Sequence, residues 1–162
     1  MEIVLIAMVT AAAWTDLRNR RIPNWIPVSG AVLGLVLHAW SGGFYGAMTS
    51  LAGAALGLGI FIALYIAGGM GAGDVKLFSA VGALVGPQAL IIVFIWTGLL
   101  GGVAALALSM FRGRLRETLG KTRALALGIN TAPAADSLRL PYGAVIAGGA
   151  LLSLMVSWLR TT

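Results

Sequence analysis

Residues 46–74 read GAMTSLAGAALGLGIFIALYIAGGMGAGD, and this stretch decides the class of fold. Its first part, 46–67, is a continuous apolar run that would extend about 30 Å as a helix, enough to cross the hydrocarbon core of a bilayer. The part that follows, 68–73, is too rich in glycine for a stable helix. Irregular backbone at membrane depth is tolerated only beside protein or a water-filled cavity, so the break before Asp74 indicates a site.

The composition of the whole chain agrees with a membrane protein. Of its 162 residues, 59% are hydrophobic and only 10% are charged, and the mean hydropathy is +0.96. A soluble domain carries roughly 25% charged residues, so a water-soluble globule is excluded. The apolar runs lack the alternation of barrel strands, which leaves a helical bundle. We therefore predict an all-α, polytopic membrane protein.

The apolar segments predict six transmembrane helices with a glycine-rich break before a short fourth one. The expected spans are residues 2–16, 26–41, 46–67, 75–86, 88–111 and 140–159. The N-terminus lacks the basic start and the small-residue cleavage site of a signal peptide, so we expect the first span to be retained. The chain, 1–162, is then a single transmembrane domain with a basic cytoplasmic loop at about 112–139 that rests on anionic lipid headgroups.

The basic residues predict the orientation. In the six-span arrangement, every Lys and Arg except Arg160 lies on one side of the membrane. The positive-inside rule makes that side cytoplasmic, with both termini outside. The net charge of +6 is thus a consequence of topology and does not indicate nucleic-acid binding. The absence of Cys from the sequence excludes structural disulfides, a Cys-ligated zinc site and thiol catalysis.

Candidate chemistry comes from the acidic residues, which are few. They are Glu2, Asp16, Asp74, Glu117 and Asp136. The expected topology places Asp16 and Asp74 at the same membrane depth. Ionisable groups near lipid are costly, so by default they mark a functional site. A structural alternative exists for each, because Asp74 could be a helix N-cap and Asp16 could pair with the Arg18–Arg21 cluster.

Two carboxylates at a low-dielectric boundary cannot both ionise easily, so they share a proton and work as one base and one acid. This arrangement suits peptide hydrolysis. The charged carboxylate activates water, while the protonated one binds the carbonyl and later protonates the leaving amine. The chemistry needs neither a metal nor a cofactor.

Sequence motifs around both aspartates resemble one family. Gly71-Ala72-Gly73-Asp74 reads as the G-x-G-D motif of intramembrane aspartyl proteases, and its extension Val75-Lys76-Leu77 looks like the form of type IV prepilin peptidases. The segment that carries the first catalytic aspartate of this family is similar to Thr15-Asp16-Leu17-Arg18 followed by Arg21-Ile22-Pro23-Asn24. Residues 140–149 resemble the last span. The chain is closest to the short prepilin peptidases of tight-adherence (Flp) pilus systems.

The resemblance implies that Asp16 and Asp74 are the catalytic pair. It also implies the substrate, a prepilin or pseudopilin with a short basic leader and a hydrophobic helix. Cleavage would occur at the cytoplasmic face of the bacterial inner membrane. The four-Cys zinc domain of the long enzymes has no counterpart in this sequence, so their N-methyltransferase activity is not expected.

Neighbours of the two aspartates are predicted to shape the site. Gly71 and Gly73 would let the backbone approach an extended substrate, and Pro23 with Asn24 would stop one segment and cap the next. Lys76 would tune Asp74 or hold an acidic side chain of the prepilin. Its alternative role is that of an interfacial lysine whose ammonium reaches the headgroup region.

Two other classes of function are compatible with the apolar composition. A small proton- or ion-coupled transporter also uses membrane carboxylates and broken helices. However, its sites lie near the midplane, whereas both aspartates are expected at one face, and the two halves of the sequence show no inverted repeat. A scaffold without catalysis is the third reading.

Overall fold

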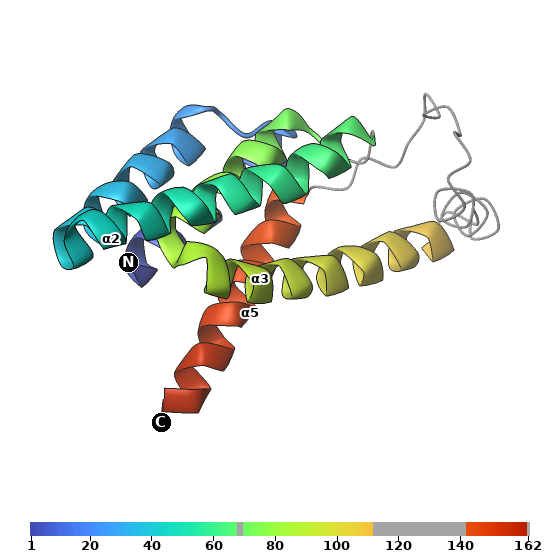
Figure 1. Ribbon diagram of the computed structural model, residues 1–162. Helices are drawn as coiled ribbons and strands as arrows, with labels where there is room; N and C mark the ends of the chain where they lie inside the picture. Colours follow the sequence, from blue (N-terminus) through green and yellow to red (C-terminus); the bar gives the residue numbers. More distant parts are fainter. Residues whose placement is uncertain (68–69, 112–141, 162) are drawn as a thin grey trace.

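The computed structural model describes residues 1–67, 70–111 and 142–161, and every regular element in this part of the chain is a helix (Figure 1). The four helices are α1 (Glu2–Asn19), α2 (Trp25–Ile66), α3 (Ala72–Phe111) and α5 (Tyr142–Thr161). The predicted all-α class is therefore confirmed. The predicted basic loop at 112–139 lies outside the described residues.

The structure does not support the prediction of six separate spans. The expected second and third spans are one helix, α2, and the expected fourth and fifth are another, α3. Each contains one non-helical residue, Gly43 (φ 56°, ψ −137°) in α2 and Gly86 (φ 76°, ψ 171°) in α3. Glycine adopts these positive φ values without steric cost, so the chain bends back inside both helices with no loop between their halves (Figure 1).

Three of the described helices are long and apolar enough to cross a membrane, namely α2, α3 over Ala72–Ala107 and α5 over Tyr142–Leu159. The first expected span, now α1, is not among them. It has only 18 residues, and Glu2, Asp16 and Arg18 are ionisable. Hydropathy averaged over a helix this short is lowered by each charged residue.

The most extensive helix contact is between α2 and α3, and it depends on glycine. The backbones touch at Gly53 and Gly82, where a Cβ on either residue would collide with the carbonyl oxygen of the other. At Gly57, a Cβ would lie 2.8 Å from the carbonyl oxygen of Phe78. Small residues permit such close approach, which is how helices gain van der Waals contact within a bilayer.

An aromatic cluster fills the space beside this contact. Phe61 of α2 stacks on Phe78 of α3, with ring centroids 3.9 Å apart and an interplanar angle of 14°. Phe94, from the second half of α3, meets both rings edge-on. Phe61 and Phe78 are among the largest fully buried side chains. The cluster fixes the first half of α3, and this is the half that begins next to Asp74.

Hydroxyl groups add hydrogen bonds between the same two helices. Ser50 donates to the carbonyl oxygen of Ala83 at 2.9 Å, and Ser79 donates to that of Ala54 at 2.9 Å. Such interhelical bonds satisfy polar groups that find no water inside a bilayer. Together with the glycine contacts they set the register of α3 against α2, and thereby the position of the α3 N-terminus.

Candidate active site

Asp16 lies in the last turn of α1 and is buried, with 8% of its surface exposed. Its Oδ2 accepts a hydrogen bond of 2.9 Å from the backbone amide of Gly143, at the start of α5. The amide of Ala144 also interacts with this carboxylate. Directly after Asp16 the helix ends, because Arg20 takes the left-handed conformation (φ 51°). The chain thus leaves α1 at the point where the carboxylate is held.

Asp74 lies in the first turn of α3 and is 9% exposed. Its Oδ2 accepts a hydrogen bond of 3.0 Å from the amide of Gly71, the residue before the helix. A carboxylate that reaches back from the third helical position satisfies a free N–H of the helix start, as in a capping box. The structural alternative is therefore partly correct: Asp74 stabilises the helix start, but from within the first turn and not as the N-cap.

The structure brings the two aspartates together. Asp74 lies within electrostatic range of Asp16, although the two residues are far apart in the sequence. The side chain of Ile22 connects the elements that carry them, since a Cβ on Gly143 would lie 2.9 Å from Ile22 Cδ1 and one on Gly73 would lie 3.4 Å from Ile22 Cβ. The link after α1, the start of α3 and the start of α5 therefore meet at one end of the bundle.

The arginine cluster is not the partner of Asp16. Hydrogen bonds from α5 hold its carboxylate, and within residues 1–67, 70–111 and 142–161 no ion pair joins it to Arg18, Arg20 or Arg21. These three side chains are exposed at the same end of the molecule as the aspartates. The alternative role of Asp16 as an arginine partner is therefore not seen, because its carboxylate faces the start of α5 while the three arginine side chains are exposed.

Lys76 and Asn24 contact each other at the end of the bundle that carries the two aspartates. Lys76 Nζ donates to Asn24 Oδ1 at 3.0 Å, which joins the start of α3 to the start of α2. Asn24 occupies the N-cap position of α2, as expected, but its side chain makes no capping bond. Pro23 precedes it and its carbonyl oxygen accepts from the amide of Ile26. Pro23 and Asn24 thus form the turn into α2, while the Asn24 amide group serves the contact with Lys76.

The two site glycines have ordinary backbone angles. Within the described part of the chain, positive φ at glycine occurs only at Gly43 and Gly86, so neither Gly71 nor Gly73 needs a left-handed conformation. A Cβ on Gly71 would lie 3.3 Å from Asp74 Oδ2, and one on Gly73 would contact Ile22. The absence of a side chain at Gly71 leaves room directly beside the Asp74 carboxylate, and its absence at Gly73 leaves room beside Ile22.

Three residues of the site had no role in the sequence-based prediction: Ile22, Tyr142 and Gly143. Tyr142, half-buried, lies within electrostatic range of Asp74, and Gly143 holds Asp16. The motif matches at 21–24 and 140–149 contain all three. However, nothing in a single sequence shows that positions 16 and 143 touch.

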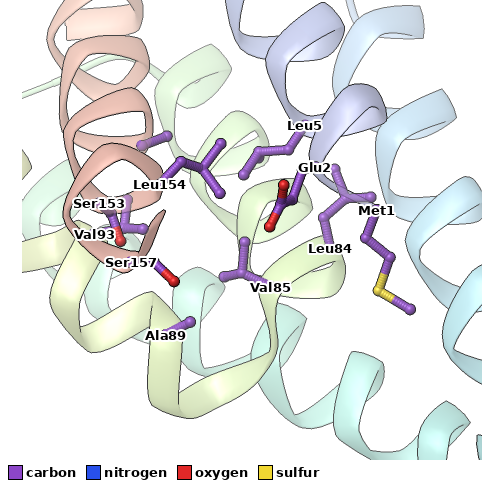
Figure 2. Close-up of a pocket in the computed structure, with 11 residues that line it drawn as sticks. Met1, Glu2, Leu5, Leu84, Val85, Ala89, Val93, Ser153, Leu154 and Ser157 are labelled. Carbon is purple, nitrogen blue, oxygen red and sulfur yellow. The ribbon is translucent and has the colours of Figure 1, made fainter. Parts of the chain in front are cut away.

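A separate cavity of about 210 Å³ lies at the other end of α1. Figure 2 shows Glu2 directed into it, between Leu5 of α1, Leu84 of α3 and Leu154 of α5. Glu2 precedes Asp16 along α1 by about 21 Å at 1.5 Å per residue, so this cavity is not part of the aspartate site. Among the described residues, no three His, Asp or Glu side chains gather as a metal site would require.

Comparison with known proteins adds two findings. A model of the type IV leader peptidase family matches residues 3–106, which include both aspartates. A Bacillus subtilis (strain 168) protein named prepilin leader peptidase/N-methyltransferase is 33% identical over 137 residues, covering 78% of this chain and 52% of that protein. One of the same name from Neisseria gonorrhoeae is 31% identical over 119 residues, covering 69% of this chain and 41% of that protein.

The chain therefore spans about half, or less, of the length of these relatives. No solved structure matches it.

Proposed function

The chain belongs to the type IV leader peptidase family, and on this premise we propose that it is a membrane aspartyl endopeptidase that removes the leader peptide from prepilins. One observation carries the proposal. Asp16 and Asp74, the two buried carboxylates of the described residues, come from different helices to the same end of the bundle. A backbone amide holds each of them, that of Gly143 in α5 for Asp16 and that of Gly71, just before α3, for Asp74.

The mechanism follows from the unequal tasks of two adjacent carboxyl groups. Because like charges at short range disfavour double ionisation, one group carries a proton and the other does not. The ionised group takes a proton from water as the water oxygen attacks the scissile carbonyl carbon. The protonated group donates a hydrogen bond to the carbonyl oxygen, and its proton passes to the leaving amine as the C–N bond breaks.

The two amide contacts support this assignment of roles. Gly71 N–H and Gly143 N–H each bind one carboxylate oxygen, Oδ2, and so fix the orientation of both groups. Within the described residues, no hydrogen bond occupies Asp74 Oδ1. A carboxyl group that is held by one oxygen keeps the other for water or for the substrate carbonyl.

The proposed substrate is a prepilin or pseudopilin with a basic leader and a hydrophobic helix, and the proposed location is the bacterial cytoplasmic membrane, with the site facing the cytoplasm. The distribution of basic residues supports this orientation, whatever the number of transmembrane spans. Arg18, Arg20, Arg21 and Lys76 are exposed at the end of the bundle that carries the aspartates, and the positive-inside rule assigns such an end to the cytoplasm. The combined motifs support a place among the short enzymes of Flp pilus systems.

The test is prepilin cleavage by the purified protein in lipid nanodiscs. Asp16→Asn and Asp74→Asn should each abolish cleavage, because an amide can neither activate water nor pass on a proton. Since groups that act as a unit are non-additive, the double variant should be hardly slower than either single one.

Glu2→Gln is the matched control, because it neutralises a carboxylate at the far end of α1 and should leave cleavage unchanged. Cleavage at the parent rate by folded Asp16→Asn or Asp74→Asn protein would refute the proposal. An intact prepilin combined with an ion flux that depends on the aspartates would favour a transporter.

A further inference from the structure

The start of α5 is the element that holds the carboxylate of Asp16. Gly143 is the second residue of α5 and is buried. The first N–H groups of a helix have no partner within the helix, and they carry the positive end of its dipole. Here the Gly143 N–H has a partner from α1, the carboxylate of Asp16, at 2.9 Å.

The space around Gly143 is filled from two sides. A Cβ at this position would lie 2.9 Å from Asp16 Oδ2, 3.0 Å from Asp16 Cβ and 2.9 Å from Ile22 Cδ1. The carboxylate therefore lies directly against the backbone of α5, and a side chain at position 143 would force Asp16 or Ile22 to shift. Among the described residues, no hydrogen bond joins the Asp16 carboxylate to α3, whereas α5 holds it through the Gly143 amide.

We propose that Gly143 is a positioning residue for Asp16: its amide fixes the carboxylate orientation needed for attack by water, and its missing side chain makes that contact possible. This inference rests on the proposed endopeptidase function. Tyr142 is consistent with it, because this preceding residue lies within electrostatic range of Asp74. The first two residues of α5 thus reach both aspartates.

The first test is Gly143→Ala, with Gly148→Ala as the matched control. Gly148 lies on the same helix, and a Cβ there would meet only the terminal Cδ1 of Leu100, at 3.0 Å. A displacement of about 1 Å in a catalytic constellation costs about 100-fold in rate. We expect Gly143→Ala to lower kcat by about that factor with little change in KM, and Gly148→Ala to cleave like the parent protein.

A second variant separates the two contacts of the added methyl group. Ile22→Val removes Cδ1, the atom of Ile22 that the methyl would meet, and leaves Asp16 in place. If displacement of Asp16 is the cause, Gly143→Ala lowers kcat by the same factor whether it is added to Ile22→Val or to the parent protein. Recovery of kcat in the double variant would overturn the proposal, because Ile22 packing would then explain the loss. The double variant also serves if Gly143→Ala alone does not fold.

The hydrogen bond itself is tested by replacing residue 143 with glycolic acid, which puts an ester oxygen in place of the amide N–H and adds no bulk. A hydrogen bond to a charged group is worth about tenfold or more, so kcat should fall by at least about tenfold. The same ester at position 148 removes a bond within the helix and should leave kcat of the folded protein unchanged. An unchanged kcat for the position-143 ester would also overturn the proposal. A parent protein that cleaves no prepilin would instead refute the proposed function.

Discussion

Replacing Lys76 by Met distinguishes the roles that this lysine could have beside Asp74. In the structure, Lys76 Nζ donates to Asn24 Oδ1 at 3.0 Å, and both side chains are exposed. A typical hydrogen bond contributes about 0.5–1.5 kcal/mol net, which corresponds to about two- to tenfold in an equilibrium or a rate. If Lys76 acts only by joining the starts of α2 and α3, Lys76→Met should lower kcat/KM for prepilin by no more than this.

A double-mutant cycle makes the expectation sharper. Asn24→Ala removes the acceptor, and it costs no helix cap because the Asn24 side chain makes none. Two residues that act through one contact are coupled. Each single variant should therefore lower kcat/KM by the same factor, and the double variant should lower it no further. The assay is the initial rate of prepilin cleavage in nanodiscs, with thermal unfolding measured in parallel to give the fraction of folded protein.

A loss of more than about 100-fold for Lys76→Met, with no loss for Asn24→Ala, would refute this reasoning. Lys76 would then contact the substrate or act directly on Asp74. Lys76→Arg is the useful companion variant in that case. It keeps the charge but not the shape of the ammonium, so it separates a general electrostatic effect from a specific contact.

Three further outcomes follow from the packing and the charge distribution. Phe78→Ala should destabilise the protein by about 3–5 kcal/mol in thermal or denaturant unfolding, because the ring is fully buried against Phe61; a loss below 1 kcal/mol would contradict the aromatic cluster. Gly53→Val should destabilise by at least about 1–3 kcal/mol through collision with Gly82, whereas Gly59→Val, which meets open space, should unfold like the parent. Single Cys probes at Asn19 and Gly42 should react from opposite sides of the membrane, with Asn19 cytoplasmic; reaction from the same side would contradict the orientation.

The amino-acid sequence by itself was enough to predict an all-helical membrane protein and to single out two aspartates as candidate site residues. Hydropathy is a sum over neighbouring residues, so a run such as 46–67 shows its environment without any knowledge of the rest of the chain. The break before α3 is equally local, because glycine disfavours helix wherever it occurs. The motif around Asp74 is contiguous, and so it could be read directly.

The tertiary structure decided what depends on distant contacts. Gly43 and Gly86 bend their helices without a loop, and whether a glycine ends a helix or only bends it depends on how the two halves pack. The partner of Asp16 is an amide 127 residues further along the chain, and the partner of Lys76 lies 52 residues before it. Spacing in one sequence cannot reveal such pairs, since they exist only after the four helices have packed and brought the ends of α1, α2, α3 and α5 to one place.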